Sequence, residues 1–234
     1  MPAESASLSL LSVISLASFF VALLTSKFSD KIGNGILLDH DFKKPQAFHN
    51  ELIPRSGGLA GIISLLIFFI LYNFLFQEIL IDYLMLSIFM FSLGFLEDVN
   101  FKINPNYRLI LMIALLVLFI TSFSINLGTI DFVFLNHWMK NNIFSIIFLT
   151  LCFLFIINGA NLIDGFNGLL TIHLLIINLI LLFLNLNNNN ETLTVIITAQ
   201  IVVLLSFLLF NFPRAKMFLG DGGSYLFGSL VAFN

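Results

Sequence analysis

Carboxylates that could do chemistry lie where apolar stretches of the chain begin or end. Glu97 and Asp98 are adjacent at the end of one stretch. Asp164 joins two further stretches, and Asp221 precedes two glycines. A carboxylate beside a membrane core is tolerated when it faces water, a cavity or a cation. Two adjacent carboxylates repel each other, and they are tolerated when a cation binds or when one of them is protonated. These positions indicate a cation or phosphate site, with solvated head-group charges as the alternative for the pair.

The segments around two of these carboxylates favour turns. Residues 158–168 read Asn-Gly-Ala-Asn-Leu-Ile-Asp-Gly-Phe-Asn-Gly, a composition that favours a turn over a continuous helix. Glycines before a helix expose backbone N–H groups that can hold phosphate oxygens, while Asp221 can hold a metal that bridges those oxygens. The alternative at this second segment is a simple turn with Asp221 or Ser224 as a helix cap.

Basic residues are interleaved with prolines and glycines in the first long polar loop. Lys44, His49 and Arg55 are candidate ligands of anionic oxygens, whereas Lys27 and Lys31 are expected only to set topology and touch lipid head groups. The glycines at positions 57 and 58 allow close approach of a ligand or a neighbouring helix, and packing alone could account for them.

The elements that must position these residues are membrane helices. Of the 234 residues 59% are hydrophobic and 10% charged, and the mean hydropathy is +1.04, which indicates a polytopic membrane protein. Roughly 18 apolar residues cross a core of about 30 Å as a helix. Residues 1–234 are therefore predicted to be one all-α transmembrane bundle with a partial eighth span from Tyr225. The seven full spans are residues 8–25, 59–76, 79–96, 109–125, 143–157, 169–186 and 193–210.

The placement of basic residues predicts the topology. Nine of the ten Lys and Arg residues follow the first, third or seventh run, and only Lys140 follows the fourth. Cytoplasmic loops carry the excess of Lys and Arg. We therefore predict that the N-terminus is outside and that the first run stays as a span, since no basic segment precedes it. Asp98, Asp164 and Asp221 should then converge on one cytoplasmic cleft bordered by Lys44 and Arg55.

Other features narrow the class of protein. The only cysteine, Cys152, excludes an intrachain disulfide and a cysteine metal cluster. A cation-coupled transporter is the alternative function, but it predicts carboxylates near mid-span. The clear runs carry only neutral or weakly basic groups such as His173, Asn178 and Gln200, so a transporter ranks below chemistry on a phosphate. His173 is interpreted as hydrogen-bonded to a neighbouring helix, with a minor proton relay left open.

Four segments together resemble the polyprenyl-phosphate N-acetylhexosamine-1-phosphate transferases of the MraY, WecA and TagO types. They are Lys44-Pro45 with Ile-Pro-Arg-Ser-Gly-Gly at 53–58, Gly-Phe-Leu-Glu-Asp at 94–98, residues 158–169 and residues 211–224. The resemblance implies ten helices in a bacterial inner membrane, with the active site on the cytoplasmic face. It also implies Mg²⁺-dependent transfer of a sugar-1-phosphate from a UDP-sugar to undecaprenyl phosphate, with release of UMP. The Ile-Pro-Arg-Ser-Gly-Gly form is closer to WecA or TagO, which favours a UDP-N-acetylhexosamine.

The resemblance also assigns residues and partners. By position, Asp98, Glu97 and Asp164 are catalytic and Asp221 binds the metal. The candidate substrate-binding residues are Lys44, His49, Arg55, Asn161, Asn167, Lys216, Gly222 and Gly223. Membrane lipid is a further partner, a homodimer is left open, and no nucleic acid is expected.

The chain departs from the family pattern at three places. Glu97 stands where the family has aspartate, and Asn167 where it often has aspartate. The ninth and tenth helices, with the histidine-bearing loop between them, are absent. The chain is therefore expected to be C-terminally incomplete, and an inactive truncated remnant is a further alternative.

Overall fold

The helices of the structure follow the predicted apolar runs. The computed structural model describes residues 2–29, 31, 35–38, 52–101, 103–128, 132–188 and 190–234. In these residues the chain forms helices and a single isolated bridge between Leu38 and Pro54, which confirms the all-α prediction. The helices are α1 (Pro2–Phe28), α2 (Gly57–Phe76), α3 (Ile81–Asp98), α4 (Pro105–Ser122), α5 (Val133–Met139), α6 (Asn142–Ile163), α7 (Leu169–Asn188), α8 (Glu191–Asn211) and α9 (Gly220–Phe233).

Asparagine side chains begin three of these helices. Asn104 accepts a hydrogen bond at the start of α4, where Pro105 occupies the first turn. Asn141 and Asn190 do the same for α6 and α8. Such caps satisfy amides that have no partner inside the helix. The starts of these three helices are therefore determined locally, by polar residues that lie between apolar runs.

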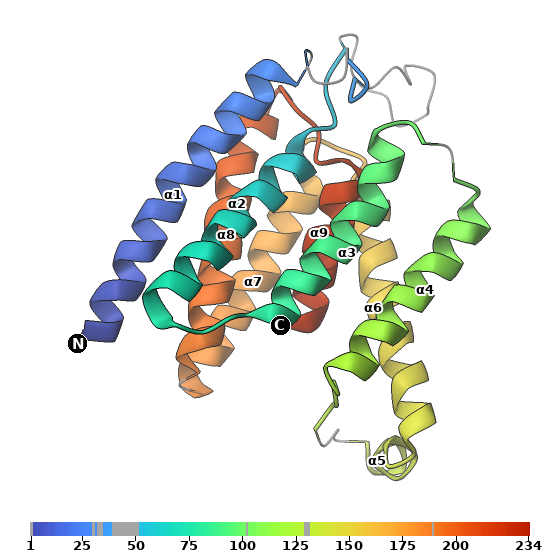
Figure 1. The fold of residues 1–234 in the computed structure, drawn as a ribbon. Helices are drawn as coiled ribbons and strands as arrows, with labels where there is room; N and C mark the ends of the chain where they lie inside the picture. Colours follow the sequence, from blue (N-terminus) through green and yellow to red (C-terminus); the bar gives the residue numbers. More distant parts are fainter. Residues whose placement is uncertain are drawn as a thin grey trace.

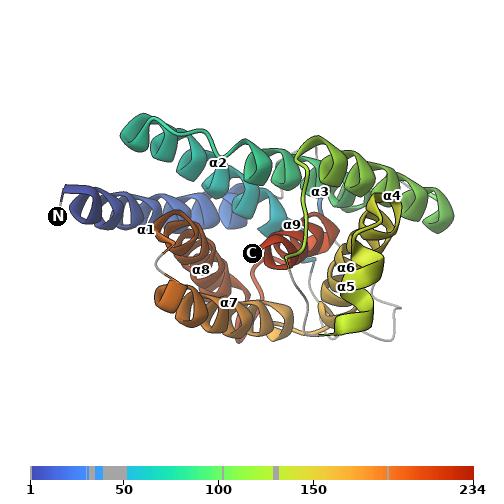
Figure 2. The same cartoon turned by 90° about the horizontal axis from the view of Figure 1, so that it is seen from below.

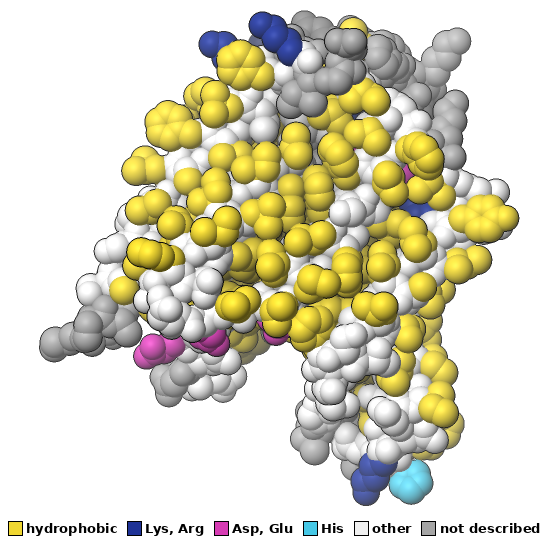
Figure 3. Space-filling view, viewed as in Figure 1, with side chains coloured by type: hydrophobic (Ala, Val, Ile, Leu, Met, Phe, Trp, Pro, Cys, Tyr) yellow, Lys and Arg dark blue, Asp and Glu magenta, His cyan; other side chains and the backbone are white. Residues whose placement is uncertain are grey.

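The length and composition of the helices suit a membrane. Within the described residues, six helices are long and apolar enough to cross one: α1, α2, α4, α6, α7 and α8. The one predicted span not among these six, residues 79–96, corresponds to α3, which has 18 residues and carries Asp82, Glu97 and Asp98. Hydrophobic side chains cover the face of the molecule shown in Figure 3, and charged side chains lie toward its two ends. The protein is therefore a multi-pass membrane protein.

The helix α9 occupies the centre of the bundle (Figures 1 and 2). It packs against α2, α3, α6 and α7. Its Leu226 and Leu230 belong to the apolar core that also contains residues of α1, α2, α7 and α8. Its Tyr225 belongs to a second core, built with α3, α4 and α6. The two halves of the bundle therefore meet on α9.

The structure differs from the sequence-based boundaries at three places. The helix α9 begins at Gly220 and not at Tyr225, because its polar first turn is stabilised from outside the helix, as described below. The helix α6 continues to Ile163, six residues past the end of its apolar run. The short helix α5 was not predicted, since it lies in a polar loop without a long apolar run.

Glycines allow α3 and α9 to approach each other closely. A Cβ atom added at Gly94 of α3 would lie 2.3 Å from the Asp221 carbonyl oxygen. That neighbour is backbone, so it cannot move aside without shifting α9. By contrast, a Cβ at Gly159 of α6 would meet no heavy atom within 4 Å. Small residues at helix interfaces are a general means of close packing in membranes.

We predict that Gly94→Ala lowers stability by about 1–3 kcal/mol, the usual cost of overpacking. The matched change Gly159→Ala, also inside a helix, should be neutral or slightly stabilising because alanine has the higher helix propensity. Thermal denaturation of the two variants in the same detergent measures the difference. Equal melting temperatures for Gly94→Ala and the unmodified protein would contradict close packing at this position.

Candidate functional site

The candidate carboxylates lie at one end of the bundle, here called the carboxylate end. The helices α3 and α6 end there, and α2 and α9 begin there (Figure 1). Glu97 and Asp98 close α3, Asp164 follows α6, and Asp221 is in the first turn of α9. Successive helices run in opposite directions, which brings these residues to the same end of the bundle, as the predicted topology implied.

Asp98 caps the N-terminus of α9 from the neighbouring helix α3. Its Oδ1 accepts a hydrogen bond from the Asp221 amide at 2.9 Å, and its Oδ2 accepts one from the Gly222 amide at 2.8 Å. Asp98 is only 2% exposed. The first amides of a helix lack internal partners and carry the positive end of its dipole, so they stabilise a buried carboxylate. The alternative of a cap at Asp221 or Ser224 therefore does not hold, because Asp98 supplies the cap.

Gly220 makes room for this cap. Its φ of 75° lies in the left-handed region, which glycine adopts without strain. A Cβ at this position would lie 2.6 Å from Asp98 Oδ1. Both the conformation and the contact therefore require glycine.

Arg108, in the first turns of α4, joins two of the carboxylates. Its Nη1 forms an ion pair with Glu97 Oε2 and lies 3.5 Å from Asp221 Oδ2. The three side chains are 21–24% exposed, and the guanidinium carbon lies 5.9 Å from the centre of the Tyr225 ring. From the sequence, Arg108 was expected only to set topology. Its position after the third run, next to the acidic pair, was the available signal.

Asp164 lies directly after the last residue of α6. Burial raises the pKa of its carboxyl to about 7, and the nearby charge of Asp221 adds to this rise, while Arg55 opposes it. Asp164 therefore lies within electrostatic reach of both Asp221 and Arg55. Asp164 thus belongs with Asp221 and Arg55 to one charged region at the carboxylate end.

Side-chain hydrogen bonds connect α6 and the loop after it to α9 and the segment before it. Asn161 Oδ1 accepts from Ser224 Oγ at 2.9 Å, and Asn167 Nδ2 donates to the Pro213 carbonyl at 3.3 Å. Asn161 and Asn167, which were predicted to bind substrate, therefore also hold these parts of the chain together.

Asn211 makes the third of these connections. It accepts from the Gly168 amide at 2.5 Å and donates to the Met217 carbonyl at 3.0 Å. Asn211 lies in a segment that carries the family resemblance, but no role was predicted for it, because its partners are distant backbone atoms.

Backbone hydrogen bonds fix the segment that carries Arg55. The Phe218 amide donates to the Pro54 carbonyl at 2.8 Å, and the Gly57 amide donates to the Phe218 carbonyl at 2.8 Å. A Cβ at Gly58 would lie 2.4 Å from the Gly223 nitrogen. Of the two roles considered for the paired glycines, close helix packing is the one that the structure shows.

The remaining candidate ligands fall into three groups. Lys44 and His49 lie outside the described residues. Lys216 is exposed at the carboxylate end. Gly222 and Gly223 are buried, and the Gly222 amide is taken by Asp98, so that amide does not point at an open anion site. Binding of a phosphate by these glycines stays a prediction.

The donor groups fit a metal that the substrate helps to hold. In the described part of the chain, no three His, Cys, Asp or Glu side chains are grouped so as to hold a metal ion by themselves. Mg²⁺ at phosphate sites is commonly bound by one or two carboxylates, substrate oxygens and water. Asp221 supplies a partly exposed carboxylate with Glu97 nearby, and Arg108 supplies positive charge. The arrangement can therefore bind a metal and a phosphate together.

Comparison with known proteins gives a family match over most of the chain. The family model described as "Glycosyl transferase family 4" matches residues 80–234. This range contains Glu97, Asp98, Arg108, Asp164 and Asp221.

Curated relatives carry two kinds of name. A phospho-N-acetylmuramoyl-pentapeptide-transferase of Dictyoglomus turgidum is 28% identical over 93% of this chain and 71% of its own length. One of the same name from Leuconostoc mesenteroides is 36% identical over 46% of this chain and 29% of its own length.

An undecaprenyl-phosphate alpha-N-acetylglucosaminyl 1-phosphate transferase of Thermotoga maritima is 28% identical over 92% of this chain and 60% of its own length. The chain thus spans less than two thirds of two of these three relatives. Because relatives with each of these two names occur, the closer resemblance to the WecA or TagO type stays a prediction.

We predict that Asp98→Asn destabilises the protein by about 1–3 kcal/mol, because one of the two α9 amides would face an NH₂ group and lose its acceptor. Hydrogen exchange should accelerate at the amides of Asp221 and Gly222. The control is Asp82→Asn, the same change at the other end of α3, which should cost less than about 1 kcal/mol. Unchanged exchange at the start of α9 would show that Asp98 does not cap it.

Proposed function

Because the chain belongs to glycosyl transferase family 4, we propose that it transfers a sugar-1-phosphate, such as N-acetylhexosamine-1-phosphate, from a UDP-sugar to undecaprenyl phosphate and releases UMP. The observation that carries this proposal is the cluster of Glu97, Arg108 and Asp221 at one end of a membrane bundle. A lipid phosphate lies at that depth, and a soluble nucleotide reaches it from the adjacent water. The names of the relatives support the same reaction class.

Asp221 is the residue proposed to hold Mg²⁺, with Glu97 close by. When bound, the metal would neutralise charge on the pyrophosphate oxygens and orient them. Asp221 is suited to this role because its side chain is partly exposed while its backbone is fixed by Asp98. Holding a carboxylate in place before the substrate arrives favours electrostatic catalysis.

For Asp98 we propose a role other than the catalytic one that the resemblance implies, which would be to orient or deprotonate the lipid phosphate. Orientation or deprotonation of the lipid phosphate requires a free carboxylate oxygen, and both oxygens of Asp98 accept amides in a buried position. We assign proton acceptance to Glu97, which is partly exposed, and a positioning role to Asp98. Arg108 and Arg55, with Lys44 of the undescribed loop, would neutralise charge that develops on the phosphates.

The proposed location is the bacterial inner membrane, with the site on the cytoplasmic face. Nine of the ten basic residues follow odd-numbered apolar runs, which places them with the carboxylates. A transporter would need carboxylates along a path through the membrane. The described Asp and Glu side chains lie at or near helix ends instead, so the transferase is the function that we retain.

Release of UMP tests the assignment of Asp221. With undecaprenyl phosphate and a series of UDP-sugars, Asp221→Asn should lower turnover by about 100-fold or more, since the amide keeps the size but loses the charge. Asp82→Asn is the control, because it makes the same change at the opposite end of the bundle. Turnover within a few-fold of the unmodified protein would remove Asp221 from the proposed metal site. The assay should use this chain and a form extended to the length of its relatives.

Substitution of the basic residues tests their contact with the anionic substrates. We expect Arg55→Ala, Lys44→Ala and Arg108→Gln each to lower kcat/KM by about tenfold or more, the scale of a lost charge-assisted hydrogen bond. Membrane insertion should be unchanged, because enough basic residues remain to set topology. Lys140→Ala, on the opposite side, is the control. Kinetic constants equal to those of the control would return these residues to a purely topological role.

A further inference from the structure

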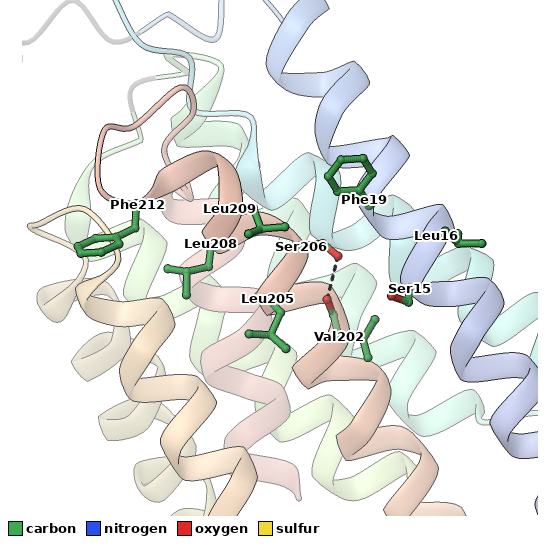
Figure 4. Close-up of a pocket in the computed structure, with 9 residues that line it drawn as sticks. All are labelled: Ser15, Leu16, Phe19, Val202, Leu205, Ser206, Leu208, Leu209 and Phe212. Carbon is green, nitrogen blue, oxygen red and sulfur yellow. Dashed lines mark hydrogen bonds between the residues drawn. The ribbon is translucent and has the colours of Figure 1, made fainter.

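A groove on the outside of the bundle lies between α1 and α8, and none of the candidate carboxylates lines it (Figure 4). Its volume is about 630 Å³, within the range of small-ligand sites. The lining is apolar apart from two serines. It consists of Ser15, Leu16, Phe19, Val202, Leu205, Ser206, Leu208, Leu209 and Phe212.

Of the two serines that line the groove, Ser206 is already hydrogen-bonded and Ser15 is exposed. Ser206 Oγ lies 2.7 Å from Ser18 Oγ and 3.0 Å from the Val202 carbonyl oxygen. Ser18 and Ser206 are 1% and 6% exposed. By contrast, Leu16, Leu205 and Leu209 are 47–68% exposed. The groove therefore presents hydrocarbon to its occupant, which suits an acyl chain and not a polar ligand.

The contact between Ser18 and Ser206 gives α1 and α8 a common register. Phe212 follows Ser206 by six residues and Lys27 follows Ser18 by nine, which is a rise of about 9 Å and about 14 Å at 1.5 Å per residue. Lys27 is also eleven residues from Leu16, or about three helical turns, and so lies on the same face of α1. Lys27 therefore stands just beyond the end of the groove, toward the carboxylate end.

The charged side chains at this end of the groove are basic. Lys27 is exposed, and its ammonium lies 5.6 Å from the centre of the Phe28 ring. The Lys31 ammonium lies 5.8 Å from the same ring, and Arg214 is exposed two residues after Phe212. Figure 3 shows Lys or Arg side chains gathered at this end of α1. Basic groups beside a membrane surface attract anionic head groups, and aromatic rings favour the same depth.

From this geometry we propose that the groove between α1 and α8 binds an anionic phospholipid, with one acyl chain in the groove and the phosphate at Lys27. The site is separate from the carboxylates and does not depend on the proposed transfer reaction. Its ligand is a structural lipid of the leaflet at the carboxylate end.

Photo-crosslinking in phosphatidylcholine nanodiscs tests this proposal. The probe is phosphatidylglycerol with a diazirine in one acyl chain, and labelled residues are found by peptide mass spectrometry. We expect labelling of the groove to exceed labelling of the exposed α6 face around Ile147, and unlabelled phosphatidylglycerol to compete where added phosphatidylcholine does not. Lys27→Gln should weaken competition by phosphatidylglycerol about fivefold, whereas Lys140→Gln should leave it unchanged.

A second variant separates the groove from the charge. Leu205→Trp fills the groove and should reduce its labelling to that of the control face. Ile147→Trp, at a residue of similar exposure on α6, should not. Equal labelling of the groove and of the α6 face around Ile147 would overturn the proposal. Unchanged labelling of the groove in the Leu205→Trp variant would also overturn it. Displacement of the probe by undecaprenyl phosphate but not by phosphatidylglycerol would also overturn it, because the groove would then belong to the substrate lipid.

Discussion

The contact of Asp98 with the first amides of α9 is the interaction on which the rest of the site depends. A helix that begins inside a bundle leaves amide donors without partners, and a buried carboxylate needs donors. Each group removes the cost of burying the other. Because α9 packs on helices from both halves of the bundle, fixing its start also fixes the positions of Asp221 and of the Tyr225 ring beneath Arg108.

This arrangement separates two carboxylates that look equivalent in the sequence. Glu97 and Asp98 are neighbours, yet Asp98 faces α9 and is buried while Glu97 faces Arg108 and is partly exposed. The rotation of about 100° between successive helical residues sends their side chains in different directions. An adjacent acidic pair can therefore combine a structural residue with a reactive one.

The membrane imposes a second constraint. Backbone groups in hydrocarbon must be satisfied within helices, so irregular segments that carry chemistry are confined to helix ends and loops. Residues 158–168 and 211–224 lie at such a position, and asparagine side chains connect the two segments. The glycines of α2, α3 and α9 allow the helices to approach closely enough for these loops to meet.

The sequence by itself determined the helical class, most of the spans and the sharing of one end of the bundle by the carboxylates. It could do so because apolar length, basic residues and chain direction are local or additive properties. It also determined the resemblance that the comparisons later supported. Only the tertiary structure decided that Asp98 caps α9, that Arg108 joins Glu97 to Asp221, and that Asn211 holds Gly168. These contacts join residues that are distant in the sequence, and which ones form depends on helix rotation and packing, for which one sequence carries no periodic signal.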